Sequence, residues 1–203
     1  MSTLQNWFAA AAAEWASSEA ELTAIDGETG DGDLGFTVSR GARAIGDALS
    51  GHEGDAKSTL RLLAETFAKS NPSSFAALFA SGVIAGSNSL PQGDALSKAD
   101  AAEALRQGCT IIMQRGRSGP GDRTLLDAAL PSIEALDACG EDSTLEDRLD
   151  AMIVASAEGV ERTKSMTPRR GRALWVGDRT QGIPDAGAVA WLRLLEALRG
   201  ALG

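Results

Sequence analysis

Three aspartates, Asp26, Asp31 and Asp33, lie within eight residues of one another in a glycine-rich stretch that ends at Gly35. Carboxylates this close repel one another unless a positive group lies between them. Mg²⁺ prefers carboxylate oxygens and commonly arrives with a phosphate, and glycine lets a backbone fold tightly around a small ion. The stretch therefore favours a metal site. The alternative is a solvated acidic turn in which Asp33 caps the following helix.

Better-known glycine and aspartate motifs do not account for this stretch. Gly30-x-Gly32-x-x-Gly35 formally matches the dinucleotide fingerprint, but that motif follows a strand, and the preceding residues here have a helical pattern. In an EF-hand loop that starts at Asp26, Thr37 would take the twelfth position, where a glutamate is required. The sequence contains no GxxxxGK[ST] motif, which excludes a P-loop.

Three further segments carry residues that suit a phosphate or a nucleotide. Residues 115–124 contain a Gly-Pro-Gly turn, and Asp122 is expected to cap a helix that begins there. Residues 168–187 contain four arginines, which bind phosphate bidentately, although a solvated basic loop is the alternative. Ser73 and Ser74 can cap a helix or offer donors to a phosphate.

Composition limits the classes of partner. A length of 203 residues makes one domain over residues 1–203 the expected organisation. The net charge of −9 argues against nucleic acid and anionic membrane surfaces, and it means that an anionic nucleotide needs metal ions to bind. No apolar run is long enough to cross a bilayer. The two cysteines, Cys109 and Cys139, form no CxxC, so we expect a reducing, cytoplasmic location.

The polarity pattern is helical along nearly the whole chain, without a convincing strand. Pro131 is expected to bend its helix or to mark a restart, and the small apolar residues of 75–86 predict a buried helix. Mostly short connections favour antiparallel neighbours, so we expect an all-α bundle of about eight helices. The expected helices cover residues 3–23, 36–50, 56–69, 75–86, 95–115, 122–138, 144–166 and 185–201.

Taken together, these segments resemble the nucleotide-binding L subunit, or C-terminal domain, of dihydroxyacetone kinase. The family's first motif, Asp-x₄-Gly-Asp-x-Asp-His-Gly-x-Asn-Met, is matched by Asp26 and residues 30–38. The second, Gly-Asp-Lys-Thr-Met-x-Asp, is matched by residues 121–127, and the third, Gly-Arg-Ala-Ser-Tyr-x-Gly-Glu-Arg-Ser-x-Gly-x-x-Asp-Pro-Gly-Ala, in part by residues 171–188. The order and spacing of all three are more specific than any one motif.

The resemblance implies a closed antiparallel barrel of eight helices that binds ATP or ADP and supports phosphoryl transfer. In the family, two Mg²⁺ ions are held against the nucleotide phosphates, a role that falls here to Asp26, Asp31 and Asp33. Arg172 would join them in catalysis. The implied nucleotide contacts are Leu34, Gly35, Thr37, Ser73, Ser74, Gly116, Leu125, Arg172, Asp185, Ala186 and Gly187.

A partner subunit is also implied. In the family, a short ketose is bound covalently to a histidine of a separate K subunit or domain, and we expect this chain to need a K-type partner. The sequence leaves open whether ATP exchanges freely or whether bound ADP is rephosphorylated by a phosphotransferase-system protein. It also leaves open whether the chain forms a homodimer.

The chain departs from the family pattern at several positions. Leu34 replaces a histidine and Thr37 an asparagine, residues 71–75 replace a Gly-Gly-Ala-Ser-Gly phosphate loop, and Ala186 replaces a proline. Loss of the glycines can block close backbone approach to a phosphate. Two alternatives therefore stay open: a binding or regulatory module that turns over no nucleotide, and the ATP domain of a fatty-acid-kinase-like system. The fuller third motif favours the ketose-kinase branch.

Overall fold

The computed structural model of the chain describes residues 3–93, 95–170 and 180–203. Within these ranges the regular structure is helical, and no strand is present. The helices are α1 (Thr3–Ala16), α2 (Glu19–Thr29), α3 (Leu34–Leu49), α4 (Ala56–Ser70), α5 (Ser74–Ser89), α6 (Lys98–Gly116), α7 (Leu126–Ala138), α8 (Leu145–Thr163) and α10 (Ala186–Gly200).

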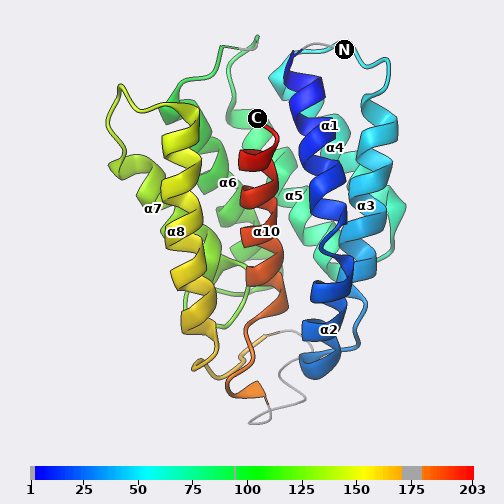
Figure 1. Cartoon of the computed structure of the whole chain (residues 1–203), viewed down its shortest axis with the longest axis vertical. Helices are drawn as coiled ribbons and strands as arrows, with labels where there is room; N and C mark the ends of the chain where they lie inside the picture. Colours follow the sequence, from blue (N-terminus) through cyan, green and yellow to red (C-terminus); the bar gives the residue numbers. More distant parts are fainter. Residues whose placement is uncertain (1–2, 94, 171–179) are drawn as a thin grey trace.

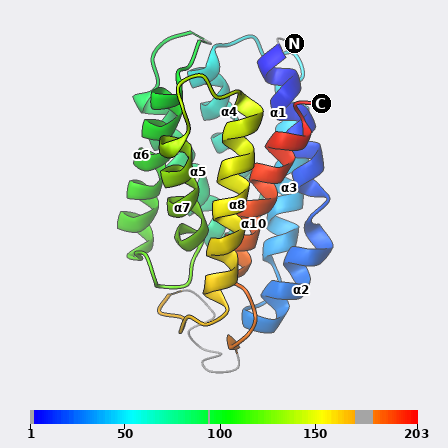
Figure 2. The ribbon, with the colours of Figure 1, turned by 60° about the vertical axis from the view of Figure 1, so that its left-hand side comes forward.

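The helices run alternately up and down and close into a ring (Figures 1 and 2). From α3 to α8 each helix packs against the next one in the chain, and α10 packs against α8. Helix α1 closes the ring because it contacts both α10 and α3, while α2 continues below α1 and packs against α3 and α10 (Figure 1). The all-α, closed antiparallel arrangement predicted from the sequence is confirmed for the described residues.

The first predicted helix, 3–23, is wrong in its extent. Helix α1 ends at Ala16, and α2 begins at Glu19 and continues to Thr29. At the break, the Ser17 hydroxyl donates to the carbonyl oxygen of Glu14 (2.6 Å), a local bond by which serine competes with helix continuation. The consequence for the site is that Asp26 lies on a helix and not in a loop.

The predicted start of the helix at 122 is also wrong. Helix α7 begins at Leu126, and the Asp122 carboxylate does not cap it but accepts a hydrogen bond from the Gly119 amide (2.9 Å). Residues 117–125 therefore form a longer loop than expected. Pro131 lies inside α7 and does not end it.

Small residues and aromatic rings hold the ring of helices together. A Cβ added at Gly86 of α5 would lie 2.6 Å from the carbonyl oxygen of Ala104 of α6, so this pair of helices is in close contact. Helix α5 is buried mainly along its small residues, not all round as predicted. Trp15 of α1 stacks on Phe67 of α4 and donates its indole N–H to the carbonyl oxygen of Ala190 of α10 (3.0 Å).

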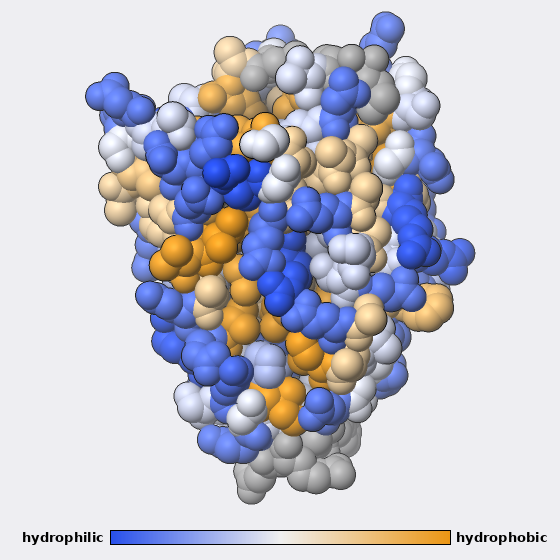
Figure 3. Space-filling model, viewed as in Figure 1, coloured by the Kyte–Doolittle hydropathy of each residue, from blue (hydrophilic) through white to orange (hydrophobic). Residues whose placement is uncertain are grey.

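The outer surface is mixed in character. Figure 3 shows hydrophilic residues interspersed with a band of hydrophobic ones on the face that carries α8 and α10. The large hydrophobic residues that are exposed in the described ranges are Phe36, Leu96, Leu145 and Val154. Among the described helices, none has both the length and the hydropathy of a bilayer span. Cys109 and Cys139 are free.

Two glycines in the helices provide a matched test of this packing. Gly86→Ala places a methyl group against the backbone of α6, and we expect the free energy of unfolding to fall by about 1–3 kcal/mol. A Cβ at Gly46 of α3 meets nothing within 4 Å. Gly46→Ala should therefore raise the free energy of unfolding by about 0.5–1 kcal/mol through helix propensity. Urea denaturation measures both. Equal stabilities of the two variants would contradict this account of the α5–α6 contact.

Candidate functional site

Four connections between helices gather at the end of the ring away from the chain termini (Figures 1 and 2). They are residues 30–33, 71–73, 117–125 and 164–185, and residues 171–179 of the last one lie outside the described ranges. Helices α3, α5, α7 and α10 therefore all begin at this end. Helix N-termini carry unpaired N–H groups and a partial positive charge, which favour anions.

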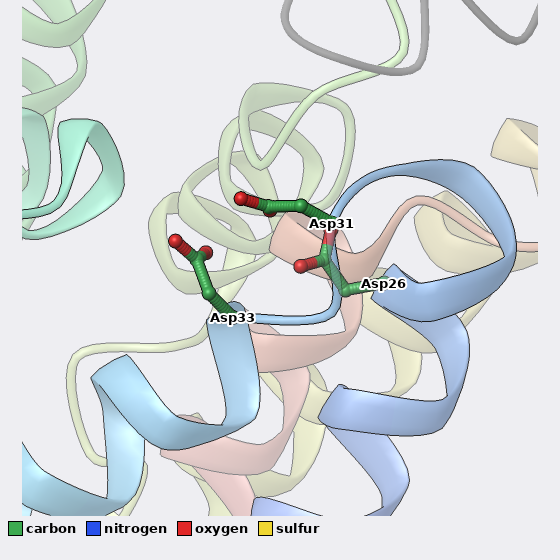
Figure 4. Close-up of side chains that lie close together, drawn as sticks. All are labelled: Asp26, Asp31 and Asp33. Carbon is green, nitrogen blue, oxygen red and sulfur yellow. The ribbon is translucent and has the colours of Figure 1, made fainter.

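The three aspartates of the first motif lie together at this end. Asp26 is on the last turn of α2, Asp31 is in the loop, and Asp33 immediately precedes α3. One oxygen of each carboxylate lies within 4.8 Å of one oxygen of the other two. Asp26 is half-buried and the other two are exposed. Figure 4 shows the three side chains extending to the same side of the loop.

Local contacts hold this arrangement. The Asp26 carboxylate accepts a hydrogen bond from the Leu34 amide (3.1 Å), which ties the end of α2 to the start of α3. A Cβ added at Gly35 would lie 2.1 Å from the carbonyl oxygen of Glu19, so only glycine allows α3 to pack this closely on α2. Asp33 occupies the N-cap position of α3, but its carboxylate makes no capping hydrogen bond. The alternative in which Asp33 serves as a helix cap is therefore not realised.

Electrostatics at the three aspartates suit a cation. Partial burial raises the pKa of the Asp26 carboxyl, and the charges of Asp31 and Asp33 raise it further, against the lowering effect of the Leu34 amide. A divalent cation would reverse this balance, because it stabilises all three ionised forms. Carboxylate oxygens are the ligands that Mg²⁺ prefers. The three side chains thus fit the donor set of a hard divalent cation.

A second group of predicted residues lies at the start of α10. The Asp185 carboxylate caps this helix by accepting from the Ala188 amide (2.8 Å). Burial raises the pKa of Asp185 to about 7; Asp127 and Asp26 also raise it, whereas Arg123 lowers it. A Cβ added at Gly187 would lie 3.5 Å from the Leu125 amide nitrogen. The structure thus brings Leu125 together with the Asp185–Gly187 segment, within electrostatic range of Asp26.

The turn at 71–73 contacts α3. The Asn71 side-chain amide donates to the Thr37 hydroxyl (3.0 Å), one turn into α3 from Asp33. Ser73 precedes α5 without making a side-chain cap bond, and Ser74 is its exposed first residue. The 71–73 turn therefore lies beside the start of α3.

Gly116 is not joined to these groups. Gly116 ends α6, and the neighbours that a Cβ there would meet are Ser118 and Leu78. Arg172, which was predicted to act in catalysis, lies outside the described residues.

Sequence reasoning missed two residues of the second motif, Asp127 and Arg123. Asp127 is buried, and its carboxylate accepts from the amides of Gly121 (2.5 Å) and Thr124 (2.8 Å), so it shapes the loop before α7. Arg123 is 1% exposed and binds backbone carbonyls near both ends of the 164–185 segment. Both residues stand at positions of the second motif, and this was the signal that could have found them.

Comparison with known proteins identifies the family. The family model described as the DAK2 domain matches residues 28–200. The chain belongs to the DAK2 domain family. The matched stretch begins two residues after Asp26 and contains the other two aspartates, the 71–75 turn and the second and third motifs.

Relatives of this DAK2 chain include kinases of short sugars. It is 33% identical over 187 residues to an L-erythrulose 1-kinase of Mycolicibacterium smegmatis, an alignment that covers 90% of this chain and 32% of that protein. It is 25% identical to the ADP-binding subunit of the PEP-dependent dihydroxyacetone kinase of Escherichia coli, over 95% of this chain and 93% of the subunit. The chain thus spans about a third of the length of several curated relatives and nearly all of this subunit.

A solved structure of the same fold is the dihydroxyacetone kinase from C. freundii in complex with AMP-PNP and Mg²⁺. The TM-score is 0.77 at 26% identity, over 98% of this chain and 34% of that one. The match confirms the DAK2 helical fold.

Asp185 gives this site a specific pH dependence. The folded protein keeps the Asp185 proton up to a pH of about 7, whereas the unfolded chain releases it near the ordinary pKa of 3.8. Folding is therefore favoured by this group below pH 4, and the contribution is lost as pH rises towards 7, by up to about 4 kcal/mol at about 1.4 kcal/mol per pKa unit. In EDTA, Asp185→Asn should become more stable than wild type as pH rises from 4 to 7.

Asp55 provides the matched control. It caps α4 as Asp185 caps α10, but hydrogen bonds from Ser58 lower its pKa. The contribution of Asp55 is complete above its unfolded pKa and is lost only at more acidic pH. Between pH 4 and 7, the free energy of unfolding of Asp55→Asn, measured by urea denaturation, should change with pH in parallel with that of wild type. If the free energy of unfolding of Asp185→Asn also changes with pH in parallel with wild type, burial does not raise the pKa of Asp185.

Proposed function

We propose that this DAK2 chain is the nucleotide- and Mg²⁺-binding module of a dihydroxyacetone-type kinase. It delivers a phosphoryl group to a short ketose that is held on a separate partner subunit. Residues 1–203 would act as one domain of this type, in the cytoplasm. The observation that carries the proposal is the grouping of three carboxylates from α2, the following loop and the start of α3 at the end of the ring where the other motif loops meet.

Asp26, Asp31 and Asp33 would hold the metal, with two Mg²⁺ ions as in the family. Mg²⁺ bound there would neutralise phosphate charge and orient the phosphoryl group. The residues of the chain supply the frame for this chemistry. The Leu34 amide fixes the Asp26 carboxylate, and Gly35 allows α3 to start close to α2. Both effects set the spacing of the three carboxylates before any ligand binds, which limits reorganisation.

The nucleotide would lie across the N-termini that share this end of the ring. Thr37, Ser73 and Ser74 line the α3–α5 side, and Leu125 with Asp185, Ala186 and Gly187 lines the α7–α10 side. Leu34, Gly35, Gly116 and Arg172 complete the proposed contacts. The Asn71–Thr37 and Gly187–Leu125 contacts support this division, because each joins two segments that the proposal assigns to one ligand.

The relatives support a partner subunit for this chain. The Escherichia coli relative is named as the ADP-binding subunit of a kinase that depends on PEP. The erythrulose kinases are about three times as long as this chain. We propose that a K-type subunit supplies the acceptor here, and that phosphoryl groups arrive either as ATP or through a phosphotransferase-system protein that recharges bound ADP.

A binding or regulatory module without turnover is the second candidate. The observation that favours it is the 71–75 turn, where Asn71 is bonded to Thr37 and the family's glycines are absent. If phosphate cannot approach this backbone closely, the nucleotide would bind without being positioned for transfer.

Replacement of Asp31 tests the metal site directly. Asp31→Asn removes one exposed carboxylate charge and keeps the shape of the side chain. We expect Mg²⁺-dependent binding of ADP and ATP, measured by calorimetric titration, to weaken by more than the roughly 10- to 100-fold that loss of an outer-shell partner causes. Asp142→Asn, an exposed residue between α7 and α8, is the matched control and should bind like wild type. Unchanged binding by Asp31→Asn would overturn the proposal.

Turnover separates the two candidates. Wild-type chain would be mixed with a K-type subunit, Mg²⁺ and either dihydroxyacetone or L-erythrulose, with ATP in one series and with ADP and a phosphotransferase-system donor in another. Formation of the sugar phosphate in either series supports the kinase. Nucleotide binding without product in any series favours the regulatory module.

A further inference from the structure

Arg123 is the most deeply enclosed charged side chain among the fully buried residues of the described chain, with 1% of its surface exposed. It lies in the loop before α7 with a positive φ of 61°, a conformation that is uncommon for any residue other than glycine. Burying a guanidinium and holding its backbone in this region both cost free energy. Such a residue persists only where the surrounding structure compensates for it.

The compensation comes from one distant segment of the chain. Arg123 Nε donates to the carbonyl oxygen of Thr163 (3.1 Å), the last residue of α8. Its Nη2 donates to the carbonyl oxygens of Thr180 (3.1 Å) and Ile183 (2.8 Å). One side chain thus joins the end of α8 to the turn that leads into α10. It fixes the two described ends of the long connection between these helices.

The next residues along this turn are the candidate nucleotide segment. The Asp185 amide donates to the Thr163 hydroxyl (2.9 Å), so the residue that Arg123 holds through its carbonyl also holds Asp185. The charge of Arg123 lies near the Asp185 carboxyl, where it opposes the effects of burial and of Asp127. The position of Asp185 in turn sets the first turn of α10, because its carboxylate accepts from Ala188.

The guanidinium has five N–H donors, two more than the three backbone carbonyls use. Nη1 is buried and has no hydrogen-bond partner among the described residues. A side chain needed only to bind three carbonyls could be a lysine, which has three N–H donors and which stands at this position in the second family motif. Arginine here and lysine in the family motif therefore meet the same requirement, a buried cation between the end of α8 and the start of α10.

We propose that Arg123 is a positioning residue for the nucleotide: it fixes the Asp185–Gly187 segment against the loop before α7 without contacting the metal. The inference rests on the proposed function for its ligand. The structural part of the inference, that a buried cation fixes residues 180–187, does not depend on the proposed function.

Arg123→Met and Arg123→Lys test this inference in the full chain. In Arg123→Met we expect affinity for ADP in the presence of Mg²⁺ to fall about tenfold or more, the range typical of lost supporting interactions. In the nucleotide-free protein, the backbone amides of residues 181–189 should exchange hydrogen faster, apart from Pro184, which has no amide hydrogen. Binding of Mn²⁺ alone to the aspartates, followed by electron paramagnetic resonance, and amide exchange in α3 should stay as in wild type. Arg123→Lys should restore ADP affinity to within about threefold of wild type.

Arg148→Met is the matched control. Arg148 also donates hydrogen bonds to loop residues, here to the Ser143 hydroxyl and the Glu141 backbone carbonyl, but at the opposite end of the ring. Arg148→Met should leave ADP affinity and hydrogen exchange of amides 181–189 unchanged. If Arg123→Met does not fold, Thr163→Val removes the hydroxyl that accepts from the Asp185 amide and leaves Arg123 in place. It should weaken ADP binding and speed exchange at Asp185.

The outcomes separate the two proposals. The positioning role is overturned if Arg123→Met binds ADP like wild type, if Arg123→Lys loses as much affinity as Arg123→Met, or if Mn²⁺ binding and exchange throughout the chain change in parallel with ADP binding. If wild-type chain binds no nucleotide, the proposed function fails. Exchange at amides 181–189 of Arg123→Met, measured without nucleotide, then still decides whether this cation fixes the segment.

Discussion

Mutual repulsion of the three carboxylates is the constraint around which this end of the molecule is built. Carboxylates whose oxygens lie within 4.8 Å of one another repel. Burial raises the pKa of Asp26 most, and the charges of Asp31 and Asp33 raise it further. The loop stays closed because the helices on either side of it are packed in backbone contact at Gly35, and because the Leu34 amide binds Asp26. The packing of α2 against α3 and α10 thus holds the three carboxylates in an arrangement that a divalent cation would stabilise.

Burial divides the carboxylates of this end into two groups with different tasks. Asp31 and Asp33 are exposed, so an ion from solvent can reach their carboxylates. Asp127 and Asp185 lie deeper and bind backbone amides, so they shape the loop before α7 and the start of α10. Arg123 is the buried cation beside this inner group. Without it, ionised Asp185 would face Asp127 and Asp26 with no compensating charge in a poorly hydrated position.

Local signals in the sequence predicted most helices, whereas the errors arose where distant residues decide. The continuation of α2 past Asp26 through Gly27 to Thr29 runs against helix propensity, and α2 is supported by contacts with α3 and α10. Asp122 resembles a cap by every local criterion. The loop around it instead takes its shape from Asp127 and from Arg123, whose partners lie 40 to 60 residues away. The three aspartates were found because their chemistry is local, but the convergence of four loops depends on ring closure, which only the resemblance implied.

The charges of the site also bear on how many ions a nucleotide would require. The three aspartates add negative charge to this end, in a protein whose net charge is already −9. One Mg²⁺ leaves the group of three carboxylates negative, whereas two make it positive, and only the second state attracts an anion by its charge. The N-termini of α3, α5, α7 and α10 contribute partial positive charges at the same end, but each amounts to about half an elementary charge. Two ions would therefore suit an anionic nucleotide better than one, and the helix ends would add to the attraction for its phosphates.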